Sequence, residues 1–387
     1  MGETKTLLYE TMKIQLLTAC FYPIVHPRAF RAYEFAKEFA TQGYDVEVFN
    51  TTTVEDFDYD SLAKVLNIKI YNLNLYKERK VKDIVAEKYN KFTLFLIKIY
   101  RFLLSYILDG RTLFMSRRIA KYLIRNAARD ADMFISFSTP FMNIYAASLY
   151  RHKAKLKDTT FIADSGDPFY YCLQTPRAFY FKYIERWVYK YQDKLTVPME
   201  AAIPAYSPII EESKIRIIPQ GFNFDDTPLA RYKVNEVPTF SYAGVFYMDI
   251  RNPKFLFDYL VSLKTQFKFR IFMRMATPQV EYFLDKYRPV LGDKLELVYG
   301  LDRKSLIYEL SKSDFLVNIN NTMTSQLPSK LIDYGITGRP IFSCDSTTFN
   351  PMQFDSFLNR TYLGDFKVDI SQYDIKVLVR SFIKLAE

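Results

Sequence analysis

The chain has few of the residues on which disulfide frameworks and metal centres depend. Its three cysteines, Cys20, Cys172 and Cys344, are widely separated and form no C-x-x-C motif. This spacing excludes a disulfide scaffold or a zinc ribbon and favours a reducing compartment. The two histidines, His26 and His152, are not paired at metal-ligand spacing. We therefore expect no metal held by the protein.

Glycine is also scarce, with 11 residues in 387, under half of the usual share of about 7%. Neither G-x-G-x-x-G nor G-x-x-x-x-G-K-[ST] occurs. The glycine-cradled phosphate sites of dinucleotide-dependent dehydrogenases and P-loop enzymes are therefore excluded.

The remaining composition is that of a folded protein with an excess of positive charge. Hydrophobic residues make up 49% and charged residues 25%, enough to bury a core and to exclude intrinsic disorder. The length of 387 residues predicts two domains. A net charge of +10 suggests an anionic partner. Nucleic acid is not favoured, because the basic residues alternate with apolar ones and form no recognisable module.

Short apolar strand patterns alternate with helical patterns in both halves of the chain. The strand patterns are KIQLLTACF, YDVEVFNTTT, MFISFST, TFIADSGDP and RIIPQGF in the first half, and TFSYAGVF, KFRIFM, LELVYG, DFLVNI and RPIFSC in the second. This alternation predicts an α/β protein with two Rossmann-like parallel-sheet domains, each sheet covered on both faces. Ligands of such sheets bind beyond the carboxyl ends of the strands, so we expect the two domains to face a central cleft.

The expected boundaries follow from composition. The stretch from Gln220 to Pro238 contains two prolines and no apolar periodicity, which is typical of a linker. We expect an N-terminal domain over 1–219, a linker over 220–237 and a C-terminal domain over 238–368. A C-terminal amphipathic helix follows over 369–387.

The segment 91–108, KFTLFLIKIYRFLLSYIL, is the most apolar of the chain. Lys98 and Arg101 interrupt it, so we do not expect it to span a membrane. On a helix, one face carries Phe92, Phe95, Leu96, Ile99, Leu103, Tyr106 and Ile107, and another carries Lys91, Lys98, Arg101 and Ser105. Two interpretations are equally compatible with this pattern: a helix lying on an anionic membrane surface, or a core helix with a solvated charged edge.

Two segments carry candidate chemistry. In NINNTMTSQLPSKLIDYGITGRPIF, a helix is expected to begin at Ser329 or Lys330, where free backbone N–H groups and the helix dipole favour a diphosphate. Asp333 follows about one turn later and suits a ribose; the alternative is N-capping by Ser329 and a solvated Asp333. In IADSGDP, Asp164 and Asp167 bracket a turn after a strand, where they act as acid or base, or only cap the turn.

Five segments of the chain, in their order along the sequence, resemble segments of the two-domain GT-B glycosyltransferases. The resemblance is particularly to the large retaining family 4, glycosyl transferases group 1. KIQLLTACFYPIVHPRAFRAYEFAKEFATQGYDVEVFNTTT resembles their opening strand, acceptor loop and first helix. IADSGDPF is similar to a strand-end segment of the first domain, and KIRIIPQGFNFDD to the stretch that closes it. AGVF resembles the strand that opens the second domain, and PSKLIDYGITGRPIF the donor-site helix. The resemblance also implies that the domain over 1–219 is acceptor-binding, that the domain over 238–368 is nucleotide-sugar-binding, and that the C-terminal helix over 369–387 returns to the first domain.

The resemblance implies roles on the donor side. Asp333 corresponds to the second glutamate of a Glu-x7-Glu pair, which binds the ribose, while Ser325 replaces the first glutamate, so the family's sugar contacts do not carry over. Ser329 and Lys330 correspond to the phosphate site, with Leu331 beside them. Arg251 is a second candidate cation, and Gly300 and Leu301 lie where the base packs.

On the acceptor side, IVHPRAF replaces the usual glycine pair and leaves His26 and Arg28 near the reaction centre. In a retaining reaction the leaving phosphate can take the acceptor proton; an inverting reaction needs a base, for which Asp167, Asp164 or His26 are the candidates. We name Arg251, Lys330, His26 and Asp167 as catalytic candidates, and Arg28 and Asp164 as acceptor-side candidates.

The expected function is therefore transfer of a sugar from a nucleoside-diphosphate donor to a hydroxyl of a lipid-linked or membrane-proximal saccharide, in cell-surface polysaccharide synthesis. The alternatives are a nucleotide-sugar epimerase of the same fold and a non-catalytic nucleotide-sugar-binding protein. We expect no cofactor besides the donor substrate, and a cytoplasmic location that includes the inner face of the cell membrane.

Overall fold

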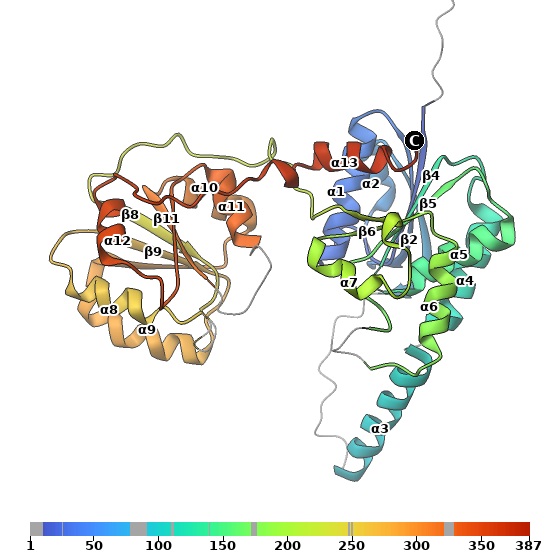
Figure 1. Ribbon diagram of the computed structural model, residues 1–387, viewed down its shortest axis with the longest axis horizontal. Coiled ribbons are helices and arrows are strands. Elements are labelled where there is room, and N and C mark those ends of the chain that lie inside the picture. Colours follow the sequence, from blue (N-terminus) through green and yellow to red (C-terminus); the bar gives the residue numbers. More distant parts are fainter. Residues whose placement is uncertain are drawn as a thin grey trace, which may run out of the picture. The chain divides into compact units, whose positions relative to one another are not determined.

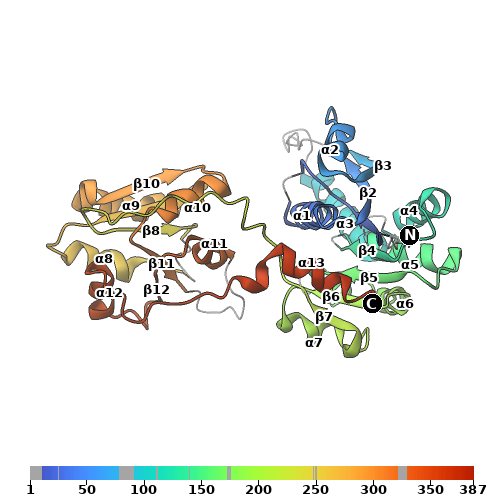
Figure 2. The same ribbon diagram turned by 90° about the horizontal axis from the view of Figure 1, so that it is seen from above.

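The chain divides into two compact units, shown in two views in Figure 1 and Figure 2. The computed structural model describes residues 11–24, 26–77, 91–109, 112–138, 140–171, 176–246, 248, 251–320 and 329–387. Unit 1 comprises Met1–Phe222 and Tyr373–Glu387, and unit 2 comprises Asn223–Gln372. Each unit contains one parallel sheet covered by helices, so the predicted α/β class with two parallel-sheet domains is confirmed.

Unit 1 is built on a seven-stranded parallel sheet within the described residues, in the order β3-β2-β1-β4-β5-β6-β7. Its strands are β1 (Lys13–Thr18), β2 (Asp45–Thr53), β3 (Lys69–Lys77), β4 (Met133–Phe137), β5 (Thr160–Asp164), β6 (Lys194–Val197) and β7 (Ile215–Ile217). The strand order reverses between β1 and β4. Loops diverge at such a switch point, which is where ligands of open parallel sheets bind.

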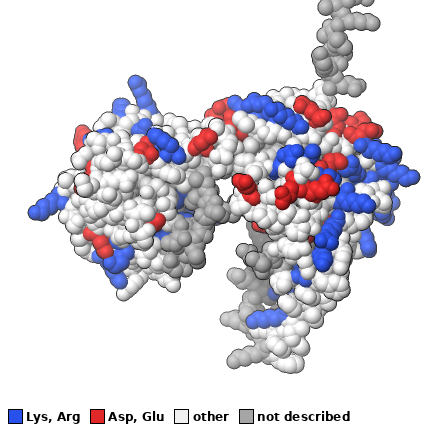
Figure 3. Space-filling model, in the orientation of Figure 1, with Lys and Arg blue, Asp and Glu red and all other residues white. Residues whose placement is uncertain are grey.

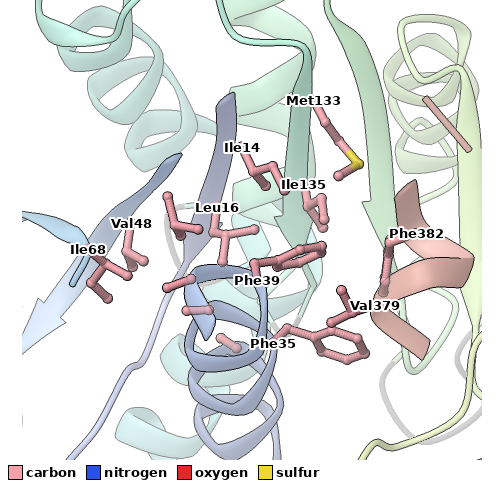
Figure 4. Close-up of a cluster of buried hydrophobic side chains, with 14 of the residues drawn as sticks. Ile14, Leu16, Phe35, Phe39, Val48, Ile68, Met133, Ile135, Val379 and Phe382 are labelled. Carbon is pink, nitrogen blue, oxygen red and sulfur yellow. The ribbon is translucent and has the colours of Figure 1, made fainter. Parts of the chain in front are cut away.

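Helices cover both faces of this sheet because the strand side chains alternate between the faces. Ile14 and Leu16 of β1 pack under Phe35 and Phe39 of the first helix, as Figure 4 shows, whereas Leu17 belongs to the cluster on the other face. The helices are α1 (Pro27–Thr41), α2 (Tyr59–Leu66), α3 (Lys91–Leu108), α4 (Thr112–Asn126), α5 (Met142–Ala154), α6 (Phe181–Lys190), α7 (Ile203–Tyr206) and α13 (Ile375–Ile383).

The C-terminal helix α13 belongs to unit 1 although it follows unit 2 in the sequence. Its Phe382 is fully buried, with its ring centroid 4.9 Å from that of Phe35 on α1. Val379 joins the same core, and the two helices lie side by side in Figure 1 and Figure 2. The predicted return of this helix to the first domain is confirmed.

Unit 2 contains a five-stranded parallel sheet in the described residues, in the order β10-β9-β8-β11-β12, which reverses between β8 and β11. Helices α8, α9 and α12 pack on one face, and α10 and α11 on the other. The strands are β8 (Thr239–Ala243), β9 (Lys268–Met273), β10 (Leu295–Tyr299), β11 (Phe315–Ile319) and β12 (Ile341–Cys344). The helices are α8 (Lys254–Ser262), α9 (Pro278–Leu291), α10 (Arg303–Ser311), α11 (Ser329–Thr337) and α12 (Pro351–Leu358).

Most of the stretch expected as a linker, 220–237, is attached to unit 2. The Tyr232 hydroxyl donates to Asp314 Oδ1 at 2.6 Å, and the Asn235 N–H reaches the same oxygen at 3.3 Å. Asp314 is fully buried at the start of β11. Hydrogen bonds to the Asp314 side chain hold this segment in place. It therefore needs no amphipathic face, and its sequence shows no apolar periodicity.

Helix α3 has no buried side chain among its described residues 92–108. The interpretation of this segment as a core helix is therefore wrong. Where the structure describes the chain, we find no helix with the length and hydropathy needed to cross a bilayer.

Candidate functional site

The carboxyl end of the second sheet carries the most concentrated set of predicted donor-side residues. At the switch point, β8 ends at Ala243 and β11 at Ile319, and helix α11 begins nearby at Ser329. Tyr334 of α11 holds these elements together: its hydroxyl donates to Val317 O at 3.1 Å and accepts from the Ala243 N–H at 2.7 Å. The helix start is therefore fixed beside the ends of the two central strands.

Lys330 lies in this corner as a partly buried cation. Its Nζ is 3.4 Å from Ile319 O, at the end of β11, and 4.6 Å from the ring centroid of Tyr242. It forms no ion pair with any described residue. Burial, together with the positive charge of Arg251, lowers the pKa of Lys330 well below its ordinary value. An anion bound here would supply the missing counter-charge.

Arg251 approaches the same corner from the loop after β8. A Cβ placed on Gly244 would lie 4.0 Å from Arg251 Nη1 and 3.8 Å from the Tyr242 hydroxyl. Gly244 has φ +119°, a conformation that favours glycine. The structure thus brings together Lys330 and Arg251, two cations 79 positions apart in the sequence.

Asp333 lies one turn further along α11, in an ion pair that the sequence did not indicate. Nε and Nη2 of Arg303 donate to its Oδ1 at 2.9 and 2.6 Å. Burial raises the pKa of Asp333, and Arg303 only partly opposes this shift. Its Oδ2 accepts no hydrogen bond from the described residues, so it can still accept one from a ligand hydroxyl.

The remaining donor-side candidates have different environments. Gly300 follows β10 with φ +74°, and Leu301 beside it is exposed, so this turn lies at the same sheet edge. Leu331 is buried in the core beneath α11, so its side chain is not available to a ligand. Ser329 begins α11, and Ser325 lies outside the described residues.

In unit 1, Asp164 is the centre of a buried ion network at the end of β5. It is 1% exposed, and Arg31 Nη2 and Arg28 Nη2 lie 2.6 and 2.7 Å from its two oxygens. The Thr196 hydroxyl also donates to it, at 2.8 Å. Burial alone would raise the pKa of Asp164, but Arg31 and Arg28 outweigh this effect and hold the pKa below its ordinary value.

This network engages the side chains of both acceptor-side candidates, Asp164 and Arg28. Arg28 also donates to Ser138 O, and its guanidinium lies 3.4 Å from where a Cβ of Gly166 would be. Both side chains are occupied in joining α1 to the ends of β4 and β5. They position the loops at the switch point, and Asp164 offers no accessible carboxylate.

His26 and Asp167 remain accessible at this edge of the first sheet. His26 is exposed and caps α1, with its Nδ1 accepting from the Arg28 N–H at 3.2 Å. Asp167 is exposed in the turn after β5, where its backbone oxygen accepts from the Ser165 hydroxyl. Of the two aspartates at this strand end, Asp164 is buried and Asp167 has a carboxylate open to solvent.

Sequence reasoning missed Arg31 and Arg303. Arg31 follows Arg28 by three residues and so lies on the same face of α1, a spacing that could have indicated a paired role. Arg303 follows the predicted turn at Gly300 and could have been considered with it. The described residues contain no group of three or more His, Cys, Asp or Glu side chains able to hold a metal ion.

No protein-family model and no curated protein matches the chain. Solved structures resemble it over almost its full length. The apo form of WaaB, a lipopolysaccharide outer core galactosyltransferase, has a TM-score of 0.57 at 14% identity, over 97% of this chain and 99% of that chain. HepE of Anabaena in complex with UDP has a TM-score of 0.56 at 9% identity, over 96% and 99%.

An epimerase resembles the chain equally well. The UDP-GlcNAc 2-epimerase of Neisseria meningitidis bound to UDP-GlcNAc has a TM-score of 0.55 at 13% identity, over 97% of this chain and 99% of that chain. At such identities the likeness establishes the fold. The chain has the GT-B fold, shared by glycosyltransferases and this epimerase.

Proposed function

We propose that this protein is a glycosyltransferase that moves a sugar from a nucleoside-diphosphate donor to a hydroxyl group. The observation that carries the proposal is the pair of cations, Lys330 and Arg251, beside Gly244 and the start of α11. Departure of a nucleoside diphosphate leaves negative charge on its phosphates, and catalysis consists largely of holding that charge. Two cations and a helix N-terminus suit this task.

The ribose and the base of the donor would be held by residues of the same sheet edge. Asp333 Oδ2 would accept from the ribose hydroxyls while Arg303 holds Oδ1, and the base would pack at the Gly300 turn. HepE and the epimerase were solved with UDP and UDP-GlcNAc. Uridine nucleotides are therefore the first donors to test.

We further propose a retaining reaction, in which the departing phosphate accepts the acceptor proton. This route requires no protein base, and it agrees with the burial of Asp164. If the reaction inverts, Asp167 is the better base of the two aspartates because its carboxylate is exposed. The acceptor we propose is a lipid-linked or membrane-proximal saccharide of a surface polysaccharide, with the protein located peripherally on the inner face of the membrane.

Lys330→Ala tests the phosphate site. We expect the unchanged chain to show a raised unfolding temperature with UDP, because a ligand of the folded state stabilises it. Loss of a charge-assisted contact costs about 1.5–3 kcal/mol, so the variant should bind UDP about 10- to 100-fold more weakly. Lys286→Ala, which removes an exposed lysine of α9, is the matched control. Equal UDP affinity in the two variants would reject the site.

Turnover distinguishes the candidate activities. A glycosyltransferase hydrolyses the donor slowly or transfers its sugar when acceptor is added, and Lys330→Ala should abolish both. The epimerase alternative, favoured by the likeness to the Neisseria enzyme, predicts a new nucleotide-sugar without any acceptor. A binding protein would produce neither product. We also propose that no metal cofactor is needed, so EDTA should leave turnover unchanged.

A further inference from the structure

Helix α3 presents apolar side chains to solvent along its whole length. Six of these, Phe92, Phe95, Leu96, Tyr100, Phe102 and Leu103, are 46–69% exposed. Isolated exposed apolar residues are ordinary on protein surfaces, whereas a continuous row on one helix indicates an interaction surface. The exposed row on α3 therefore has the character of an interaction surface.

Among the described residues, hydrogen bonds attach the C-terminal end of α3 to the rest of unit 1. The Ala178 N–H donates to Tyr106 O at 3.1 Å, and the Tyr180 hydroxyl donates to Ile107 O. Arg177 Nε lies 2.9 Å from Asp109 Oδ1, just past the helix. From this attachment the helix projects away from the sheet, as Figure 1 shows. Its exposed face is thus held in a fixed direction.

The charge around this surface has one sign. Residues 91–126, which include α3 and α4, contain eight basic residues and a single acidic one, Asp109, which is paired with Arg177. Lys98 and Arg101 are exposed on α3. On α4 the apolar side chains of Met115, Ile119 and Leu123 face the core, which leaves its cations outward. In Figure 3 the projecting helix shows white and blue spheres.

Aromatic side chains surround the attached end. Phe179, between the two residues bonded to α3, is 72% exposed, and Phe114 and Tyr183 are 58% and 57% exposed. Lys182 lies over the Tyr183 ring at 5.3 Å, and Arg118 over the Phe114 ring at 5.8 Å. Exposed aromatic rings beside cations are typical of the boundary between lipid headgroups and acyl chains.

We propose that α3, with the surrounding Phe114, Phe179 and Tyr183, is a docking surface for a bilayer that contains anionic phospholipids. The apolar face enters the headgroup–acyl boundary, and Lys98 and Arg101 contact the phosphates. Because both cations lie near the middle of the helix, it lies along the interface and does not cross the bilayer. The inference deepens the peripheral location proposed above, but its test requires no glycosyl transfer.

A second copy of the chain is the competing occupant, and the charges disfavour it. In a two-fold symmetric pairing of α3 helices, the same patch contacts itself, so Lys98 and Arg101 would meet the like charges of the other copy. No acidic residue of α3 is available to neutralise them. An anionic lipid surface complements both the apolar row and the cations.

Co-sedimentation of the full chain with vesicles tests the proposal. We compare vesicles of equal parts phosphatidylglycerol and phosphatidylcholine with vesicles of phosphatidylcholine alone. Binding to the anionic vesicles should be at least tenfold tighter and should weaken with added salt. Phe95→Ser/Leu96→Ser should reduce it at least tenfold, and Lys98→Glu/Arg101→Glu should remove the preference for phosphatidylglycerol. These side chains are exposed, so the unfolding temperature should not change.

Matched variants on unit 2 separate local docking from general effects. Met352→Ser/Leu363→Ser removes two exposed apolar residues, and Lys286→Glu/Lys304→Glu makes the same change in net charge; both should bind vesicles as the unchanged chain does. Equal loss in the control and α3 variants, or equal binding to both kinds of vesicle, would overturn the proposal. So would self-association through α3, seen by sedimentation velocity, without vesicle binding. Lys330→Ala should dock normally, which separates this proposal from the proposed activity.

Discussion

Glu185 on α6 is a buried carboxyl group that no pattern in the sequence pointed to. It is fully buried, and its Oε1 and Oε2 accept the backbone N–H groups of Phe169 and Tyr170 at 3.0 and 3.1 Å. It therefore fixes the chain just after the Asp164–Asp167 turn. Burial raises the pKa of Glu185 to about 7, and the two backbone hydrogen bonds only partly oppose this.

This raised pKa predicts a pH-dependent stability of unit 1. Since the folded-state pKa lies above the ordinary value of 4.5, the stabilisation is fully present below pH 4.5 and is lost as the pH rises through about 7. Relative to Glu185→Gln, the unchanged chain should lose about 3 kcal/mol of unfolding free energy between pH 4.5 and pH 8. Urea unfolding at both pH values measures this. For Glu200→Gln, at an exposed position, the unfolding free energy should change with pH by the same amount as in the unchanged chain. If it also changed by that amount in Glu185→Gln, the assignment would be contradicted.

The sequence located the candidate site residues better than it described their partners. The helix start at Lys330 and the turn after β5 were both predicted, because they follow apolar strand patterns directly. The pairing of Asp333 with Arg303, and of Asp164 with Arg28 and Arg31, joins residues far apart in the chain. Such contacts depend on sheet order, which no local pattern contains.

At the scale of elements, most strands were predicted, and two strands of unit 1, β3 and β6, were not. β3 alternates Asn72 and Asn74 with apolar residues, and it is a strand because it pairs with β2 at the sheet edge. β6, Lys194–Val197, has only four residues, and parallel neighbours on both sides define it. Short or polar strands are specified by their partners more than by their own composition.

Helix α13 follows unit 2 in the sequence but packs in the core of unit 1, and this packing can be tested. Phe382→Ala removes a fully buried ring packed on Phe35 and Phe39, and large-to-small changes of this kind cost about 3–5 kcal/mol. Val377→Ala on the same helix, at a side chain 37% exposed, should cost less than about 0.5 kcal/mol. Chemical unfolding followed by circular dichroism measures both. Equal effects would mean that α13 does not complete the core of unit 1.

At the scale of the whole molecule, the order of strand and helix patterns predicts two domains. It does not predict where unit 2 begins, which is Asn223. The segment 223–237 has no apolar periodicity, so composition alone assigned it to a linker. Its attachment to unit 2 depends on hydrogen bonds to Asp314 and Ser311, about 80 residues away. Composition detects the absence of a helix or strand, and it does not detect an irregular segment held by a buried carboxylate.

Fragments of unit 2 test this boundary. A fragment of residues 223–372 contains a complete sheet and core, so we expect it to unfold cooperatively on its own. A fragment of residues 238–372 lacks the Tyr232 hydroxyl and the Asn235 N–H, and it leaves the buried Asp314 with fewer donors. Because an unsatisfied buried polar group costs about 1–3 kcal/mol, the shorter fragment should be less stable by at least that amount in urea unfolding. Equal stability of the two fragments would show that 223–237 is a linker after all.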